Sequence, residues 1–197
     1  MVGPADHGKS TIVRILTAYA CRLDRTPILV DLDVGQGTIV PGCVSAIPLD
    51  KTCLNVEEGF SNYNPLVHFY GHTTPKDNVE IYKLLLNNLV EKINSRFEKD
   101  ADAKSSGLII NTCGWIEAAG FDLLLHIMKL FAIDVALVMG HDKLYSNLAS
   151  SVDGAGTRVI IVRLPRSGGT VNRVSNISDS VLLLCSYISI DYFPFTY

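Results

Sequence analysis

Short apolar runs recur along the chain, separated by longer segments of mixed polarity. Their length and their turn-forming flanks are typical of buried strands. The runs occupy residues 27–33, 66–71, 107–112, 134–140 and 157–164. Between the first two lies a long stretch with no sustained pattern, which contains GQGTIVPG and NVEEGFSNYNP. Because long loops inside α/β domains tend to carry function, we expect this stretch to be irregular and functional.

The segments between the runs place apolar residues at helical spacing. The first begins at residue 9, and its apolar face consists of Ile12, Ile15, Leu16, Tyr19 and Leu23. Similar segments over 76–98, 121–131 and 142–151 predict three more helices. Since strands and helices alternate, we expect an α/β fold with a mainly parallel β-sheet covered by helices on both faces.

The last part of the chain differs from the rest. After Arg173 it contains no Lys or Arg and mixes Ser with apolar and aromatic residues. We therefore predict one domain over residues 1–173 and an atypical tail over 174–197.

Composition limits the classes of function. Among 197 residues, 48% are hydrophobic and 19% charged, which favours a folded globular protein over a disordered one. The net charge of −3 gives no global basic field, so a polyanion would have to bind at a local site. The five cysteines form no Cys-x-x-Cys pair, which favours reduced thiols. No apolar run reaches the roughly 20 residues that span a bilayer, so we expect no membrane partner.

A glycine motif opens the chain. GPADHGKST places Gly3, Gly8, Lys9 and Ser10 at the spacing of a P-loop, and a helix follows it. In such a loop the backbone N–H groups surround a phosphate, the lysine reaches the β- and γ-phosphates, and the serine ligates Mg²⁺. The alternative is a glycine-containing helix start that binds nothing. The other nucleotide-binding candidates are the neighbouring loop residues Asp6, His7 and Thr11, although His7 occupies a free position of the motif.

Two carboxylates follow the first apolar run. In LVDLDVGQG, Asp31 and Asp33 stand at the carboxyl end of a predicted strand, where a P-loop fold holds its magnesium. Asp33 is the better candidate because it is nearer the strand's end, whereas Asp31 can be structural. Gln36 lies on a glycine-flanked turn and could orient a nucleophile.

Together these motifs carry a resemblance. GPADHGKST, VDLDVGQG, VEEGFS, PLVHFYGHTTPKDN, INTCGW and LPRSGG occur in this order between Gly3 and Arg173. The set resembles the polynucleotide 5′-hydroxyl kinase family, in the branch found in the eukaryotic pre-mRNA 3′-end cleavage complex and with the tRNA-splicing endonuclease. DLDVGQG together with NTCGW is far more specific than the P-loop alone.

The resemblance implies an activity and roles for individual residues. The activity is transfer of the ATP γ-phosphoryl group to the 5′-hydroxyl of RNA. Lys9 would hold the phosphates, Ser10 the Mg²⁺, and Asp33 would act as base or metal ligand beside Gln36. The clasp over the phosphates would be formed by Thr73, Thr74 and Asn78. Trp115 would support the RNA end by stacking, although a core tryptophan is the alternative.

The resemblance also shows departures. Arg166 and Arg173 match lid arginines that close over the transferring phosphate, with Arg173 as the catalytic one, but the next family arginine would fall near Ser178. The family's N-terminal β domain, the strand before the P-loop and the C-terminal domain have no counterpart in this sequence. We therefore expect a truncated P-loop domain with an unpaired slot in its sheet.

The sequence thus favours an ATP- and Mg²⁺-dependent RNA 5′-hydroxyl kinase that acts in the nucleus in mRNA 3′-end processing and tRNA splicing. One alternative is a scaffold subunit of the cleavage complex that holds ATP without turning it over. Another is a P-loop NTPase that hydrolyses ATP to water. Nothing in the sequence separates RNA from DNA as the acceptor.

Overall fold

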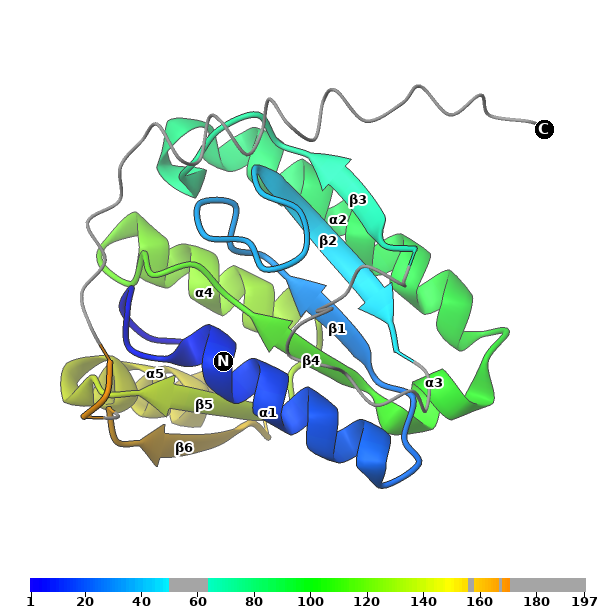
Figure 1. The fold of residues 1–197 in the computed structure, drawn as a ribbon. Coiled ribbons are helices and arrows are strands. Elements are labelled where there is room, and N and C mark those ends of the chain that lie inside the picture. The colour runs from blue at the N-terminus through cyan, green and yellow to red at the C-terminus, as the bar shows by residue number, and fades with distance from the viewer. Residues whose placement is uncertain (50–63, 156–157, 167, 171–197) are drawn as a thin grey trace.

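The computed structural model describes residues 1–49, 64–155, 158–166 and 168–170. Four strands form one sheet in the order β3-β2-β1-β4, and β5 and β6 pair separately (Figure 1). In chain order the elements are α1 (Lys9–Arg22), β1 (Ile28–Asp31), β2 (Cys43–Pro48), β3 (Leu66–Phe69), η1 (Pro75–Asp77), α2 (Val79–Phe97), α3 (Ala101–Ser106), β4 (Leu108–Asn111), α4 (Ala119–Leu130), β5 (Val135–Met139), α5 (Asp142–Ala155) and β6 (Ile160–Leu164).

The α/β class is confirmed, but the sheet is mixed. The β1–β4 and β5–β6 pairings are parallel, whereas β2 is antiparallel to both β1 and β3. Strand β2 lies inside the stretch that we expected to be irregular, so that expectation was wrong for residues 43–48. Its sequence CVSAIP shows no alternation because Cys43 through Ile47 are all buried.

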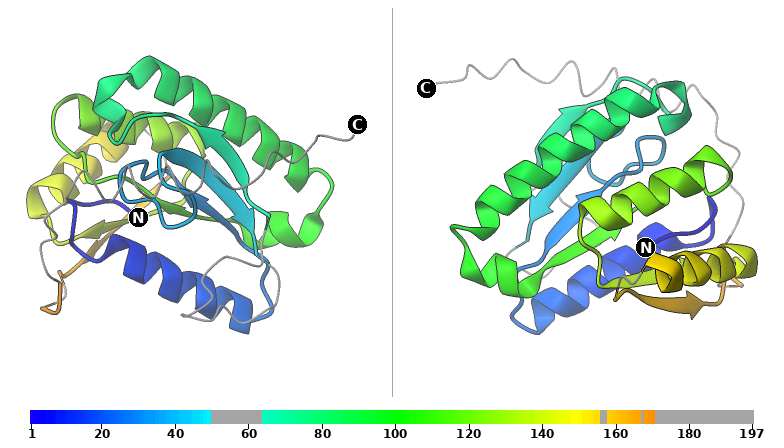
Figure 2. Two further views of the ribbon diagram at one scale, coloured as in Figure 1. Left: turned by 45° about the horizontal axis from the view of Figure 1, so that its top comes forward. Right: turned by 180° about the vertical axis from the view of Figure 1, so that it is seen from behind.

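Helices cover both faces of the larger sheet (Figure 2). On one face, α1 packs through Val13 and Cys21 against Leu29 and Ile47. On the other face, α2 and α4 pack against β1 and β2 and form the largest core cluster, with Tyr82 fully buried. A third cluster joins α4 and α5 to β5. The layers therefore hold the carboxyl ends of β1 and β4 next to the start of α1.

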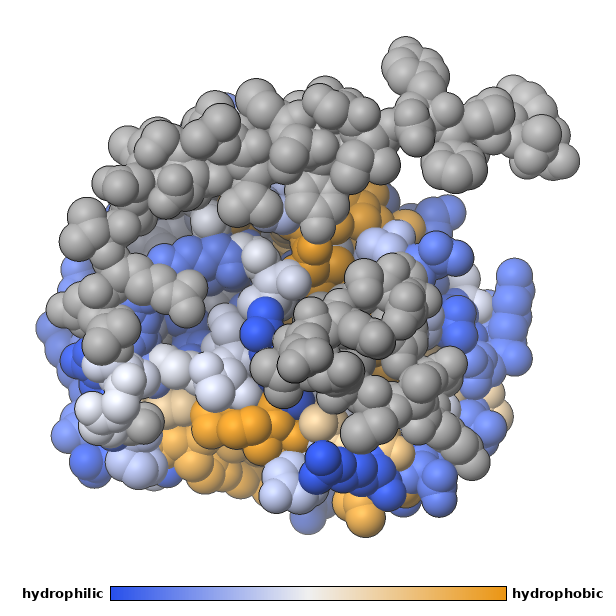
Figure 3. Space-filling view, viewed as in Figure 1, coloured by the Kyte–Doolittle hydropathy of each residue, from blue (hydrophilic) through white to orange (hydrophobic). Residues whose placement is uncertain are grey.

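Helix α1 buries a different face from the one that the apolar spacing indicates. Its buried residues are Lys9, Val13, Thr17 and Cys21. Four members of the expected apolar face are exposed, Ile15 by 43%, Leu16 by 39%, Tyr19 by 59% and Leu23 by 73%. Figure 3 shows hydrophobic surface over this part of the molecule. Lys9 is buried beside the loop, and the other buried residues follow it at intervals of four, which places all of them on one face of the helix.

The two residues before the loop bridge β4 and β5. The Val2 N–H donates to the Leu137 carbonyl at 2.9 Å, and the Met139 N–H donates to the Val2 carbonyl at 2.9 Å. The Met1 ammonium donates to the Ile110 carbonyl at 2.8 Å. The slot that we expected in the sheet is therefore closed at this end by Met1 and Val2. Within the described ranges no helix is long and apolar enough to cross a membrane.

Candidate functional site

The loop between Val2 and α1 needs glycine at two positions. Gly3 has φ 147°, and a Cβ there would lie 2.8 Å from the Met139 carbonyl oxygen. Gly8 caps α1 with φ 93°, in the left-handed region. A side chain at either position would strain the backbone. These glycines let the loop turn tightly between the sheet and the helix, as the motif predicts.

Lys9 and Ser10 lie at the start of α1. The Lys9 side chain is buried, and its Nζ donates to the Pro4 carbonyl at 2.8 Å. Burial lowers the pKa of Lys9, and the nearby Asp33 carboxylate opposes that shift. The Ser10 hydroxyl accepts a 3.4 Å hydrogen bond from Asn111 at the end of β4. Because the partner of Lys9 in the loop is a neutral carbonyl, an anionic phosphate would be a stronger partner.

A cavity of about 270 Å³ opens beside the loop, which we call the loop cavity. Its lining comes from the loop, α1, the segment after β1 and the segment after β6. The lining residues are Asp6, Gly8, Lys9, Ser10, Thr11, Arg14, Asp33, Gln36, Thr38, Gly169 and Thr170. The sequence analysis did not single out Arg14 or Thr170, and it quoted Thr38 and Gly169 only as members of GQGTIVPG and LPRSGG, without a role of their own. Helical spacing could have found Arg14, because it lies four residues after Ser10 on α1.

The two carboxylates after β1 differ in their surroundings. Asp31 is 1% exposed and accepts hydrogen bonds from the Asp33 N–H at 3.1 Å, the Thr38 hydroxyl at 2.8 Å and the Asn111 amide at 3.1 Å. The Thr38 N–H donates to it as well. Asp31 is therefore saturated by partners within the protein, which suits a structural role.

Asp33 faces the loop cavity. Its Oδ1 accepts hydrogen bonds from the N–H groups of Gly35 at 3.1 Å and Gln36 at 3.0 Å, which fix the carboxylate. Burial raises the pKa of Asp33, and the Gln36 N–H opposes this shift. A carboxylate with a raised pKa is a better proton acceptor than an ordinary one.

Asp33 also lines a second cavity, of about 580 Å³. We call it the Trp115 cavity. Asp33 and Gln36 line both this cavity and the loop cavity. The remaining lining consists of Pro4, Ala5, Gly35, Thr73, Thr74, Pro75, Lys76, Cys113, Gly114, Trp115, Ile116, Glu117 and His141. Trp115 is half-buried, and the Lys76 Nζ lies 5.5 Å from the centroid of its ring.

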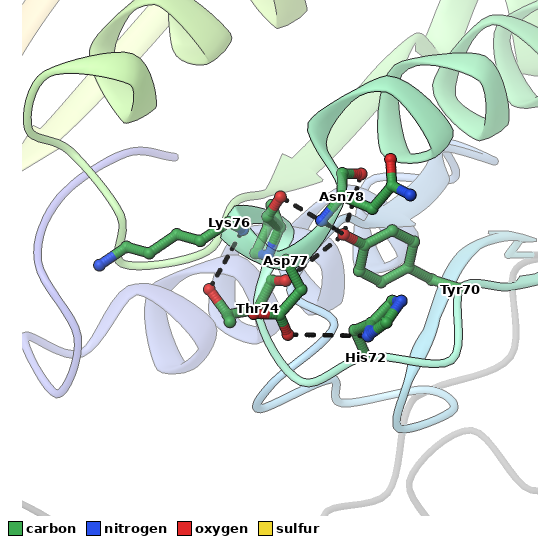
Figure 4. Close-up of polar contacts among 7 residues, drawn as sticks. Tyr70, His72, Thr74, Lys76, Asp77 and Asn78 are labelled. Atoms are coloured by element: carbon green, nitrogen blue, oxygen red, sulfur yellow. Dashed lines mark hydrogen bonds and ion pairs between the residues drawn. The ribbon is translucent and has the colours of Figure 1, made fainter.

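The turn TTPKDN is held in place by Tyr70 (Figure 4). The Tyr70 hydroxyl donates to the Asn78 carbonyl at 3.0 Å and accepts from the Asn78 N–H at 3.0 Å. The Asn78 side chain caps α2 by accepting from the Ile81 N–H. Thr73 and Thr74 line the Trp115 cavity, not the loop cavity, among the described residues. The turn therefore holds Lys76 beside Trp115.

Of the remaining predicted site residues, those that the structure describes line neither cavity. His7 contacts the Ala5 carbonyl through Nδ1 at 2.8 Å, and its ring packs against Gly140. The Arg166 Nε donates to the Thr170 hydroxyl at 2.7 Å, next to the loop cavity. Arg173, the VEEGFS motif and the tail lie outside the described residues.

The loop cavity offers oxygen ligands that suit Mg²⁺. The Ser10 hydroxyl and the Asp33 carboxylate both line it. Mg²⁺ in phosphate sites usually takes one or two protein oxygens and completes its shell with water and phosphate oxygens. Within the described residues no group of three or more His, Cys, Asp or Glu side chains could hold a metal by itself. The arrangement therefore fits a metal that binds together with a nucleotide.

The fold has close structural counterparts. It matches Clp1p in a solved complex with Pcf11p with a TM-score of 0.74 at 21% identity, covering all of this chain (100%) and 50% of that one. A second structure of these two proteins, which addresses ATP loss in a point mutant, matches with a TM-score of 0.74 at 23% identity and covers 95% of this chain and 47% of that one.

Sequence comparisons agree with the fold. The chain is 45% identical over 177 residues to the CLP1 homologue of Culex quinquefasciatus, covering 89% of this chain and 41% of the relative. It is 44% identical over 174 residues to the polyribonucleotide 5′-hydroxyl-kinase Clp1 of Danio rerio, covering 88% and 38%. The chain thus spans about two fifths of the length of these relatives. Because the family described as mRNA cleavage and polyadenylation factor CLP1 P-loop matches residues 3–181, the chain belongs to the Clp1 P-loop family.

Proposed function

We propose that this chain carries the core of an ATP-dependent RNA 5′-hydroxyl kinase. One observation carries the proposal: Asp33 and Gln36 line both the loop cavity and the Trp115 cavity, so the two cavities meet at these residues. A transferase needs donor and acceptor sites that meet at the reacting atoms, whereas a simple hydrolase needs only the donor site. The relative from Danio rerio, named as a 5′-hydroxyl kinase, supports this assignment.

In this proposal each cavity holds one substrate. The loop cavity would hold the phosphates of ATP through the loop N–H groups, Lys9 and Arg14. Ser10 would hold Mg²⁺, which when bound neutralises charge on the phosphates, and Asp33 would contact the metal only through a water molecule, which leaves its carboxylate free to act as the base. The Trp115 cavity would hold the 5′ end of the RNA, with its terminal base on Trp115.

The chain's own side chains would then move the proton and stabilise charge. Asp33 would accept the proton of the 5′-hydroxyl, and Gln36 would orient that hydroxyl. Lid arginines, Arg166 and Arg173, would approach the transferring phosphate from the segment after β6. Thr73 and Thr74 would border the reacting groups from the Trp115 cavity, and Asn78 would support them by capping α2.

The cellular role that we propose is supported by the family description. This description as an mRNA cleavage and polyadenylation factor supports a nuclear role in pre-mRNA 3′-end processing, and we extend this to tRNA splicing. The second candidate function is an ATP-holding scaffold of the cleavage complex. The observation that favours it is the structural match to Clp1p bound to Pcf11p. In that role, subunits of the complex and the tRNA-splicing endonuclease would be the partners.

Incubation of the chain with γ-labelled ATP, Mg²⁺ and a 5′-hydroxyl oligoribonucleotide tests the proposal. A kinase labels the RNA, a scaffold retains ATP without labelling, and a hydrolase releases phosphate independently of RNA. Lys9→Ala should abolish labelling, whereas Lys104→Ala, on the exposed surface of α3, should not. Labelling that persists in Lys9→Ala would overturn the assignment of the loop cavity.

A further inference from the structure

The Trp115 cavity continues away from Asp33 into a third cavity. This third cavity has a volume of about 560 Å³ and shares Ile116, Glu117 and His141 with the Trp115 cavity. We call it the α4–α5 subsite, because it lies where those two helices begin. Its further lining residues are Ala118, Phe121, Asp122, Lys143, Leu144 and Asn147. Both cavities fall within the range of about 300–1,000 Å³ that is typical of small-ligand sites.

His141 stands at the junction of the two cavities in a fixed orientation. Its Nδ1 accepts a 3.0 Å hydrogen bond from the Leu144 N–H at the start of α5. In the neutral ring the hydrogen then lies on Nε2, which makes this nitrogen a donor. His141 therefore gives the junction of the two cavities a polar side chain in a fixed orientation, which a bound ligand could contact.

The lining of the α4–α5 subsite suits a nucleobase better than a phosphate. Two carboxylates, Glu117 and Asp122, outnumber the single cation Lys143, so the local charge opposes an anion. Phe121 packs with part of its side chain against the core cluster of β5, α4 and α5, which limits its motion. Asp122 and Asn147 are exposed and can bond to the edges of a base. An aromatic ring beside hydrogen-bonding groups is how proteins recognise unpaired bases.

We propose that the α4–α5 subsite binds a second nucleobase of the acceptor strand, downstream of the base on Trp115. This inference rests on the proposed function and deepens it. It makes the preferred acceptor a single strand of several nucleotides, because a mononucleotide or a continuous duplex cannot place a second, unpaired base in this subsite.

Equilibrium binding without ATP tests the inference separately from phosphoryl transfer. The probes are adenosine 3′-phosphate and a 5′-hydroxyl tetra-adenylate, together with tetra-adenylates that are abasic at the second, third or fourth position. Phe121→Leu removes the ring but keeps most of its apolar volume. Asn147→Ala removes an exposed amide that lines the subsite. Asn94→Ala removes an exposed amide on α2, outside the subsite, and is the matched control.

We expect Phe121→Leu to weaken tetra-adenylate binding about tenfold, the order of one lost aromatic stack, and to leave mononucleotide binding unchanged. One of the three abasic tetra-adenylates should bind the wild-type protein about as weakly as intact tetra-adenylate binds Phe121→Leu. For that abasic ligand, Phe121→Leu should cause no further loss of affinity. Equal loss for both ligands, no loss for tetra-adenylate, or wild-type binding independent of length would overturn the inference. If binding depended on strand length but no RNA were labelled, the proposed kinase activity would be wrong, whereas the proposed base-binding role of the α4–α5 subsite would be supported.

Discussion

The carboxylate of Asp31 accepts a 3.1 Å hydrogen bond from the backbone N–H of Asp33. The first carboxylate thereby fixes the backbone of the second. The side chains of Thr38 and Asn111 also donate hydrogen bonds to the Asp31 carboxylate. Asp33, in contrast, lines both cavities. Of the two acidic residues in this short motif, Asp31 is therefore bonded within the protein, whereas Asp33 lines the cavities where we propose that the reaction occurs.

Exchanging each carboxylate for an amide should separate these roles. Asp33→Asn should keep the fold and lower the rate of phosphoryl transfer by about 10²–10⁴, the usual contribution of a positioned base. Asp31→Asn should lower the free energy of unfolding by about 1–3 kcal/mol, because an amide cannot accept all the hydrogen bonds of this buried carboxylate. Thermal unfolding and single-turnover transfer measure the two effects. Equal unfolding midpoints for Asp31→Asn and the wild type would contradict the structural role.

Gly114 allows the loop after β4 to approach closely the loop between Val2 and α1, which we call the phosphate loop after its motif. A Cβ at Gly114 would lie 2.5 Å from the backbone nitrogen of Ala5, so Gly114→Ala must displace the phosphate loop. We expect at least a tenfold loss of ATP affinity, because the loop N–H groups would no longer converge on the phosphates. Calorimetric titration with ATP measures it.

Gly168→Ala provides the control, since an added Cβ there meets no atom within 4 Å. It should leave the unfolding midpoint unchanged, whereas Gly114→Ala should lower it. A wild-type ATP affinity in Gly114→Ala would show that the phosphate loop tolerates the displacement.

The buried Met1 ammonium should make stability depend on pH. Burial lowers its pKa from 8.0 to about 5, and the charge of Lys9 adds to this. Between these values the unfolded chain binds more protons than the folded one, so stability should rise as pH increases from about 5 to about 8. The full effect is on the order of 4 kcal/mol, from 1.36 kcal/mol per unit of pKa.

Acetylation of the N-terminal amine isolates this effect. The acetylated amide is neutral, yet it keeps an N–H that can donate to Ile110. Urea unfolding at pH 5.5 and pH 8 should therefore show a smaller difference for the acetylated chain than for the free amine. The raised pKa of Asp33 acts in the opposite direction in both forms and cancels in the comparison. Identical pH profiles would contradict the burial of the ammonium.

Much of the fold could be predicted because local patterns agree with the tertiary structure. The runs that became β1, β4 and β5 each contain an unbroken apolar stretch, at residues 28–30, 108–110 and 135–139, as is typical of strands that are covered on both faces. Strand β2 escaped detection because it carries small and polar residues whose burial depends on its neighbours β1 and β3. Its antiparallel direction depends on the same neighbours, so no local pattern could reveal it.

The buried face of α1 shows where periodicity fails. Apolar spacing favours Leu16 and Tyr19, yet the structure buries Thr17, whose hydroxyl is satisfied by the Val13 carbonyl at 2.8 Å. The P-loop motif fixes the spacing of Gly8, Lys9 and Ser10, so their positions around one cavity could be predicted, whereas their roles in phosphate and metal binding stay predictions. His141 was not predicted because it meets the other lining residues only in the folded chain, where the segment after β5 lies beside the start of α4. Arg14 was missed although helical spacing from Ser10 could have indicated it.

Ala118 holds a backbone conformation that glycine adopts more readily. It precedes α4 with φ 47° and ψ −122°, and it lines the α4–α5 subsite. A Cβ in this region costs about 1–3 kcal/mol. Ala118→Gly should therefore raise the free energy of unfolding by about 1 kcal/mol, after the greater entropy of glycine in the unfolded chain is subtracted.

Ala149→Gly, inside α5, supplies the matched comparison with the opposite sign. There the backbone is helical, so glycine should lower the free energy of unfolding by about 1 kcal/mol. Urea unfolding of both variants measures the difference. If Ala118→Gly destabilised the protein as much as Ala149→Gly does, the backbone at Ala118 would not be strained. The α4–α5 subsite would then contain no strained residue at this position.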